Sequence, residues 1–279
     1  MGATGGPIKG GSAVRVQDFG HFEGPVVLFG GAYSNLQALE ALVAGAGKRP
    51  LVSTGDAVGY CAQPAETVAL MRKAGVPGIA GNCERQLAGD AEDCGCGFED
   101  GSACDLLSQG WFPYLKRAAD PETAAWAGSL PDIGVFMQAG RRYGVIHGGV
   151  TSISRFLWPS SEEPDFMAEI TALEALAGPV DGVVAGHSGI AFHRRIGRHQ
   201  WINAGAIGLP PHDGRAETRF AVLTDGDVVI ERLRYDHAAA RAEMERAGLT
   251  QGYHETLSTG IWPSEDVLPR EMRRSVFVY

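Results

Sequence analysis

The stretch PVVLFGGAYSNLQALEAL, residues 25–42, contains in one run the elements that decide the fold. Residues 25–29 are apolar and predict a buried strand, two glycines turn the chain, and an amphipathic helical pattern follows. Such a turn lies at the carboxyl end of a sheet strand, where active-site loops are common. Residues 30–34 nevertheless include no carboxylate, histidine or cysteine. The loop is therefore placed for chemistry but lacks the side chains that usually perform it.

The same order of strand, glycine turn and helix recurs downstream. Residues 51–54 and 76–80 are strand-like and end at glycines, and helical stretches follow both, the first near 64–74. Three later pairs of strands flank short polar turns and predict hairpins: 133–138 with 143–147, 192–196 with 200–203, and 220–223 with 228–233. We therefore expect an α/β fold with mixed sheets.

The chain shows no internal repeat and no clear linker. Residues 1–24 are rich in glycine near their start and are expected to form a flexible tail, which leaves 25–279 as a single domain. Within that domain, residues 85–125 are the least regular and are expected to form a cap or insertion. Residues 237–247 have a helical pattern.

Composition excludes several classes of function. The formal net charge of −9 argues against binding of nucleic acid polymers, which requires a basic surface. No apolar run approaches the roughly 20 residues of a membrane span, and no signal peptide is apparent, so we expect a cytoplasmic protein. Five cysteines without an export signal argue against a disulfide framework.

Four predicted strand ends carry a polar residue beside a glycine: Asp56, Asn82, His147 and His187. Each residue alone is better explained as a turn, cap or core residue than as a ligand. Together, a carboxylate, an amide oxygen and two imidazoles form a complete site for one divalent transition metal ion. Manganese, iron and zinc are the candidate ions.

The motifs around these residues resemble a known family. The segments GDAVGY (55–60), GNCE (81–84), VIHGG (145–149) and GHSG (186–189) occur in the order seen in calcineurin-like metallophosphoesterases, and are most similar to the small bacterial phosphodiesterase branch. The segments SNLQALEAL (34–42) and INAGAIGLPPHDG (202–214) extend the resemblance over nearly the whole chain. It implies a four-layered α/β/β/α sandwich.

The resemblance also explains the opening loop. The family's first motif is Asp-x-His, but Gly31 and Tyr33 stand at those positions here, and Gly189 replaces the second histidine of the last motif. In the family these three residues are private ligands of one metal, so the resemblance implies that this metal site is lost. The resemblance implies that the other site is intact, with Asp56, Asn82, His147 and His187 as its ligands.

Further roles follow from the same comparison. The family's third motif ends in residues that act on the leaving group, which makes Cys83 and Glu84 candidate catalytic residues. Asn35 and Tyr33 belong to the first motif and are candidate substrate-binding residues. For Tyr33, metal coordination and simple packing over the lost site are alternatives.

The resulting hypothesis is a hydrolase of phosphate mono- or diesters that uses the single retained metal and acts on a small phosphorylated substrate. A second copy of the chain, in a homo-oligomer, is a further candidate partner. Two alternatives remain open. Two histidines and a carboxylate are also the ligands of mononuclear non-haem iron enzymes with redox or lyase activity. A non-catalytic module that binds a metal or nucleotide is the other.

The segment DCGCGFEDGSAC (93–104) places Cys94, Cys96 and Cys104 in the predicted cap. Their spacing matches no standard zinc or iron–sulfur site. Packing as small apolar residues is favoured slightly over a role beside the metal, in soft-metal binding or in a redox disulfide.

Overall fold

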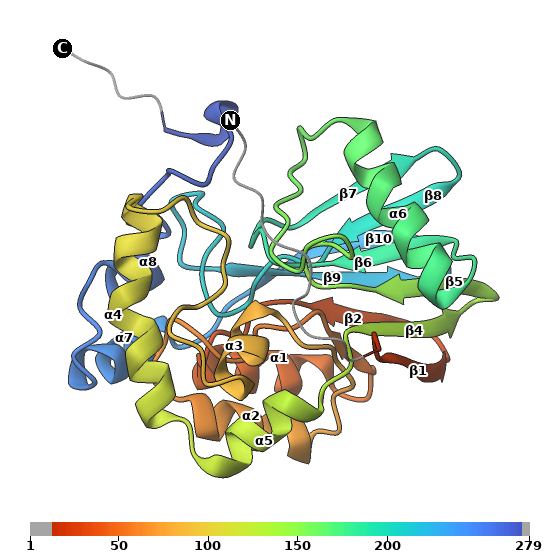
Figure 1. Ribbon diagram of the computed structural model, residues 1–279. Coiled ribbons are helices and arrows are strands. Elements are labelled where there is room, and N and C mark those ends of the chain that lie inside the picture. The colour runs from red at the N-terminus through yellow and green to blue at the C-terminus, as the bar shows by residue number, and fades with distance from the viewer. Residues whose placement is uncertain (1–12, 275–279) are drawn as a thin grey trace.

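The computed structural model describes residues 13–274 and contains two stacked mixed sheets (Figure 1). The larger sheet has the strand order β1-β4-β5-β6-β8-β7. Its strands are β1 (Val16–Phe22), β4 (Ile133–Gln138), β5 (Arg141–Val145), β6 (Gly182–Ala185), β7 (Phe192–Ile196) and β8 (His199–Asn203). The smaller sheet has the order β10-β9-β2-β3. Its strands are β2 (Val26–Phe29), β3 (Leu51–Ser53), β9 (Thr218–Thr224) and β10 (Asp227–Leu233).

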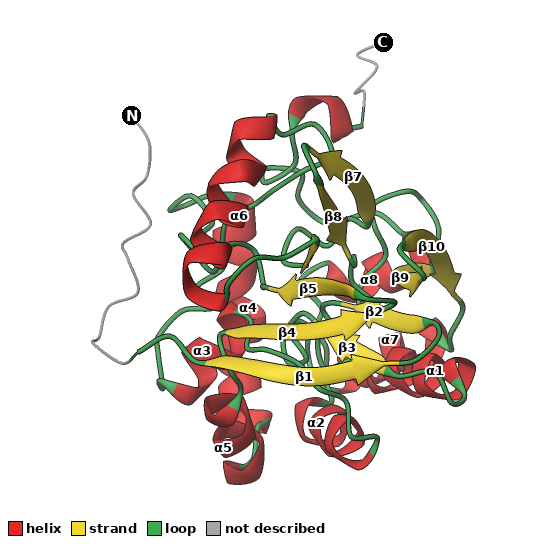
Figure 2. Ribbon diagram, turned by 90° about the vertical axis from the view of Figure 1, so that its right-hand side faces the viewer, coloured by secondary structure: helices red, strands yellow, loops and turns green. Residues whose placement is uncertain are grey.

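Helices cover the outer face of each sheet, as Figures 1 and 2 show. Helix α6 (Glu163–Ala177) packs on the larger sheet, and α1 (Leu36–Ala46) and α2 (Pro64–Lys73) pack on the smaller one. The remaining helices are α3 (Asn82–Ala88), α4 (Ala103–Ala118), α5 (Pro121–Ser129), α7 (His237–Arg246), α8 (Tyr253–Thr259) and the short 3-10 turn η1 (Arg270–Met272).

Strand β2 shows why the layers stack as they do. All four of its residues are buried, and successive side chains point to opposite faces of a strand. Val26 and Leu28 therefore pack between the two sheets, whereas Val27 and Phe29 pack under α1. A separate apolar cluster lies between the larger sheet and α6. These three packed layers of side chains confirm the expected four-layered α/β/β/α sandwich.

The three predicted hairpins are confirmed. Strands β4 and β5, β7 and β8, and β9 and β10 each pair antiparallel across a short turn. The parallel pairs β2–β3, β5–β6 and β6–β8 direct their carboxyl ends to the same region of the molecule. That region receives the loops with the candidate ligands.

Other expectations need correction. Residues 16–22, which we expected in a tail, form β1, which pairs parallel with β4; residues 1–12 lie outside the described residues. Residues 76–80 form no strand and make only an isolated bridge between Gly78 and Ser53. The irregular segment 85–125 contains most of α3, all of α4 and the start of α5. Helix α7 confirms the pattern at 237–247.

Within residues 13–274, no helix is both long enough and apolar enough to span a bilayer.

Candidate metal centre

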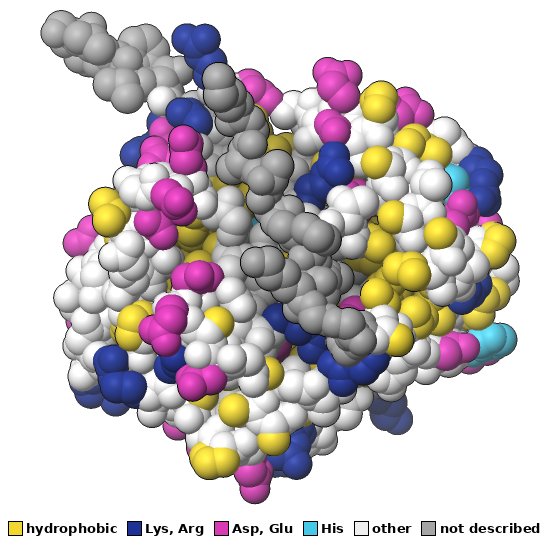
Figure 3. All heavy atoms as spheres, in the orientation of Figure 1, with side chains coloured by type: hydrophobic (Ala, Val, Ile, Leu, Met, Phe, Trp, Pro, Cys, Tyr) yellow, Lys and Arg dark blue, Asp and Glu magenta, His cyan; other side chains and the backbone are white. Residues whose placement is uncertain are grey.

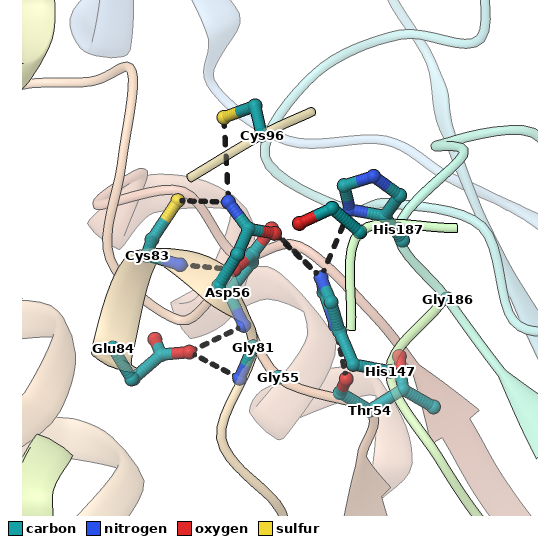
Figure 4. Close-up of polar contacts among 12 residues, drawn as sticks. Thr54, Gly55, Asp56, Gly81, Cys83, Glu84, Cys96, His147, Gly186 and His187 are labelled. Atoms are coloured by element: carbon teal, nitrogen blue, oxygen red, sulfur yellow. Dashed lines mark hydrogen bonds and ion pairs between the residues drawn. The ribbon is translucent and has the colours of Figure 1, made fainter. Parts of the chain in front are cut away.

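Each sheet contributes to one cluster of polar side chains. Asp56 follows β3, and Asn82 opens α3 after the irregular segment that runs beside β3. His147 follows β5, and His187 follows β6. Figure 4 shows Asp56, His147 and His187 turned toward one another. The structure thus brings together the four residues that the sequence marked as metal ligands.

Their donor atoms surround one point. His147 Nε2 lies 3.2 Å from Asp56 Oδ2, 3.0 Å from Asn82 Oδ1 and 3.1 Å from His187 Nδ1. One donor atom from each of Asp56, His147 and His187 lies within 4.8 Å of the others. Asp56, Asn82 and His147 are at most 3% exposed, so water does not separate these atoms.

Hydrogen bonds outside the cluster fix the orientation of two of its members. His147 Nδ1 donates to the Thr54 carbonyl over 2.7 Å, which leaves Nε2 to present its lone pair inward. The Asn82 amide nitrogen donates to the Cys94 carbonyl over 2.8 Å, which turns Oδ1 toward His147. Lone pairs of nitrogen and oxygen then face one another, and a divalent cation fits such a set.

The protonation states of Asp56 and His187 agree with a ligand set. Burial raises the pKa of Asp56, but interaction with His147 outweighs it and the pKa lies below its ordinary value. Burial lowers the pKa of His147, but the Asp56 carboxylate outweighs it and the net direction is upward. Burial and the neighbouring His147 lower the pKa of His187 to about 3, so this imidazole is neutral. A carboxylate and a neutral imidazole are ligand forms.

The backbone at the ligands is strained and closely packed. Asp56 and His187 have φ values of 55° and 63°, in the left-handed region that non-glycine residues seldom adopt. A Cβ at Gly81 would overlap with Asp56 Oδ1, so only glycine lets this carboxylate reach its place. The loop sequence therefore specifies the position of Asp56 as well as its identity.

The structure places Glu84, a candidate catalytic residue from the sequence, against the backbone of the Asp56 loop. Its carboxylate is fully buried and accepts hydrogen bonds from the backbone amides of Gly81 (2.7 Å), Asp56 (2.8 Å) and Val58 (3.1 Å). Figure 4 shows it turned to the backbone at Gly81, and it does not line the cavity beside the cluster. Glu84 therefore holds the loop of Asp56 against the start of α3.

Cys83 is likewise placed away from that cavity. Its side chain is fully buried, and its backbone amide donates to Asp56 Oδ1 over 3.1 Å. A hydrogen bond with Cys96 lowers the pKa of Cys83, but burial and the Asp56 charge raise it well above its ordinary value. A thiol in this position is a poor acid for a leaving group, so the expected catalytic role of Cys83 has no support in the geometry.

Asn35 caps a helix. Its Oδ1 accepts from the Ala38 amide at the start of α1, and its Nδ2 donates to the Gly208 carbonyl. Both polar atoms are thereby used, the residue is 1% exposed, and it does not line the cavity. This geometry supports a structural role as a helix cap and gives no support to the expected contact with substrate.

Tyr33 does line the cavity, and its ring also fills the space beside Gly31. Its ring lies over Gly31, where a Cβ would overlap with the ring carbons. A Cβ at Gly189 would lie 3.4 Å from the Trp262 ring, an ordinary van der Waals contact. Of the three positions that differ from the family's ligands, Tyr33 is itself aromatic and the two glycines each have an aromatic ring beside them.

The cysteines of the segment 93–104 are all buried and free. Cys96 Sγ accepts from the Asn82 amide nitrogen over 3.3 Å, and the Cys94 carbonyl accepts from the same atom. Cys96 and Cys104 also line the cavity. These residues therefore support a ligand and a cavity wall, which goes beyond the apolar packing favoured from the sequence.

Sequence analysis missed several residues of the cavity: Tyr60, Phe98, Phe156, Tyr253 and Trp262. The Phe156 ring packs on His187 with centroids 4.3 Å apart, and Tyr60 stacks on Trp111 at 4.4 Å. Only Tyr60 carried a signal, because it closes the motif that begins at Gly55. The others come from distant segments without a shared pattern.

No protein-family model and no curated protein match the chain. Solved structures do. A metallophosphoesterase from Sphaerobacter thermophilus aligns with a TM-score of 0.67 and 21% identity, over 86% of this chain and 100% of that one. A hypothetical protein from Pyrococcus horikoshii OT3 aligns with a TM-score of 0.70 and 16% identity, over 85% of this chain and 98% of that one. The chain therefore has the fold of the metallophosphoesterases, as its motifs predicted.

Proposed function

We propose that the protein hydrolyses phosphate esters with one divalent transition metal ion held by Asp56, Asn82, His147 and His187. The observation that carries this proposal is the convergence of their four donor atoms on one buried point beside a cavity. A likeness in fold to a metallophosphoesterase agrees with it. Manganese and zinc are the ions most suited to hydrolysis by this ligand set.

The neighbouring aromatic rings support a single ion. A second ion would need ligands near positions 31, 33 and 189, where glycines and Tyr33 offer no carboxylate or imidazole. The Tyr33 ring occupies the space beside Gly31, and the Trp262 ring lies at van der Waals distance from Gly189. That side of Asp56 therefore lacks carboxylate and imidazole ligands, and the Tyr33 ring takes up the room beside Gly31.

An ion bound at this site would supply a Lewis acid that activates water and polarises a phosphoryl oxygen. Hydrolysis forms a bond from the water oxygen to phosphorus, breaks the bond to the leaving oxygen, and transfers one water proton to the leaving group. The chain's own residues orient this chemistry. Thr54 fixes the His147 ring, Glu84 fixes the Asp56 loop, and the aromatic wall excludes bulk water.

A second candidate function rests on the ligand types. Asp56, His147 and His187 form the two-histidine, one-carboxylate set of non-haem iron(II) enzymes, and they are the residues within 4.8 Å of one another. A redox or lyase reaction with iron is therefore the alternative on the same site. The identity of the bound metal separates the two candidates.

Metal content of protein purified without chelator is the first test. We expect about one ion per chain in the unaltered protein and loss of that ion in Asp56→Ala. Asp90→Ala is the matched control, because Asp90 is exposed and pairs only with Lys116. Manganese or zinc, together with hydrolysis of bis-p-nitrophenyl phosphate that Asp56→Ala abolishes, would support the proposal.

Other results would contradict it. About two ions per chain would disprove the single site, and no retained metal would disprove the metal site. Iron with dioxygen consumption, and no hydrolysis of any phosphate ester after loading with manganese or zinc, would replace hydrolysis by the redox alternative.

A further inference from the structure

The cavity beside the metal centre has an aromatic wall. It has a volume of about 50 Å³, room for a few waters or a short substituent. Asp56 and His187 lie at one side of it. Six aromatic side chains line the rest, together with smaller residues: Tyr33, Tyr60, Phe98, Phe156, Tyr253 and Trp262.

No arginine or lysine lines this cavity among the described residues. Its surroundings are acidic. Glu99 and Asp266 line an adjoining hollow that shares Phe98 and Phe156 with it. Asp93, Asp100 and Asp105 line a larger groove on the other side of Phe98, where Arg155 is the one basic residue and is paired with Glu169. Figure 3 shows acidic side chains spread over the face that carries α4.

The charges at the site therefore limit the negative charge that a bound ligand can carry. One divalent ion with the Asp56 carboxylate leaves a net charge of about +1, because the other ligands are neutral groups. A monoanion brings the site to neutrality. A dianion leaves an uncompensated negative charge in a dry cavity without a cationic side chain, which is costly at low dielectric.

Three phenols line the cavity. The Tyr60 ring lies 4.6 Å from that of Tyr33 and 4.8 Å from that of Tyr253, between centroids. Within residues 13–274 none of the three hydroxyls has a hydrogen-bond partner, although Tyr33 and Tyr253 are only 6% and 9% exposed. Each phenol carries one O–H group that can donate a hydrogen bond to a ligand in the cavity.

Resting on the function proposed above, we propose that this cavity selects monoanionic phosphodiesters with a short apolar substituent and discriminates against dianionic monoesters. The phenols of Tyr33, Tyr60 and Tyr253 donate hydrogen bonds to the phosphate oxygens in place of basic side chains. The substituent packs against the apolar rings of the same wall. Neutral donors suit a monoanion, because they add no charge to a site that one anion already balances.

Two substrates with the same leaving group test the preference. Methyl p-nitrophenyl phosphate is a monoanionic diester, and p-nitrophenyl phosphate is a dianion at about pH 8. We expect kcat/KM of the metal-loaded protein to be at least about tenfold higher for the diester. A cavity with basic side chains would not disfavour the dianionic monoester in this way. A monoester that is hydrolysed as fast or faster would overturn the charge preference and leave the hydrolase intact.

Binding without turnover gives an independent readout. Calorimetry with dimethyl phosphate and methyl phosphate should show at least about tenfold tighter binding of the diester to the metal-loaded protein. Tyr33→Phe and Tyr253→Phe should each weaken dimethyl phosphate several-fold with unchanged metal content. Tyr114→Phe is the matched control, because the Tyr114 hydroxyl donates to the Ala62 carbonyl and Tyr114 does not line the cavity.

The two proposals fail separately. If neither nitrophenyl ester is hydrolysed, hydrolysis as the function is wrong, and tighter binding of dimethyl phosphate than methyl phosphate would still support a site for monoanions. If the two anions bind equally, or both Tyr→Phe variants bind like the control, the proposed selection by charge and phenols is wrong.

Discussion

Two regions meet at Asp56, and they differ in kind. On one side, Asn82, His147 and His187 turn polar atoms toward a single point. On the other, the rings of Tyr33 and Trp262 lie over glycines. The Tyr33 ring fills the space beside Gly31, and the Trp262 ring lies at van der Waals distance from Gly189. On this side of Asp56, aromatic packing therefore stands where the other side has polar ligand atoms.

The largest expected effect comes from adding a side chain at Gly81, next to the Asp56 carboxylate. Gly81 has an extended backbone that any residue adopts, but a Cβ there would overlap with Asp56 Oδ1. We expect Gly81→Ala to displace the carboxylate and remove the bound metal, as measured by elemental analysis. Gly45→Ala is the control, since its Cβ meets nothing within 4 Å and alanine favours helix α1. Full metal occupancy in Gly81→Ala would mean that Asp56 is not a ligand.

A smaller effect is expected from a change at Glu84, whose carboxylate holds the loop of Asp56 in place. Glutamine at position 84 keeps one oxygen for the three backbone amides that the carboxylate binds, and its NH₂ faces donors. We expect Glu84→Gln to weaken metal affinity about 10–100-fold, the range for residues that orient ligands. Glu122→Gln, at an exposed ion pair, should leave the affinity unchanged. Unchanged affinity with lost turnover would instead restore the catalytic role expected from the sequence.

The difference between Glu84 and the ligands shows what sequence could predict. A polar residue directly after a strand has little freedom of position, so local patterns predicted that Asp56, His147 and His187 would lie together, as they do. The hydrogen bonds of Glu84 and Asn35 to the backbone were not predicted, because a carboxylate or amide that binds backbone amides has the same sequence signature as one that binds substrate. The burial of the side chain and its hydrogen-bond partners distinguish the two cases, and neither property can be read from the amino-acid sequence.

The aromatic region could not be predicted for another reason. Tyr60, Tyr253 and Trp262 come from a loop, α8 and the segment after it, and only tertiary packing places them around one cavity. The fold itself was predictable because strand alternation and short turns are local. Strand β1 was missed because its residues are largely exposed and polar, which weakens the alternating pattern.

The aromatic side can be tested by trying to restore a ligand. Gly31→Asp places a side chain where the Tyr33 ring lies, and such overpacking is expected to lower the free energy of unfolding by about 1–3 kcal/mol. Adding Tyr33→His should recover most of that loss, a coupling that urea denaturation of both single variants and the double variant measures. Gly24→Asp is the control: it shares the positive φ, but its Cβ meets nothing within 4 Å. Additive effects would show that the ring does not fill the lost site.

The smallest effect on function is expected at Asn35, which belongs to neither region. Asn35→Ala removes the cap of α1 and the bond to the Gly208 carbonyl, and should lower the free energy of unfolding by about 1 kcal/mol. KM for any ester that the protein hydrolyses should not change, because both polar atoms of Asn35 are bound to the protein. A raised KM with unchanged stability would place Asn35 at the substrate, and the boundary of the functional site would then have to include the start of α1. If stability alone changes, Asn35 matches the family's first motif but only caps helix α1. The loop at residues 30–34 then contributes the Tyr33 ring to the cavity and no metal ligand.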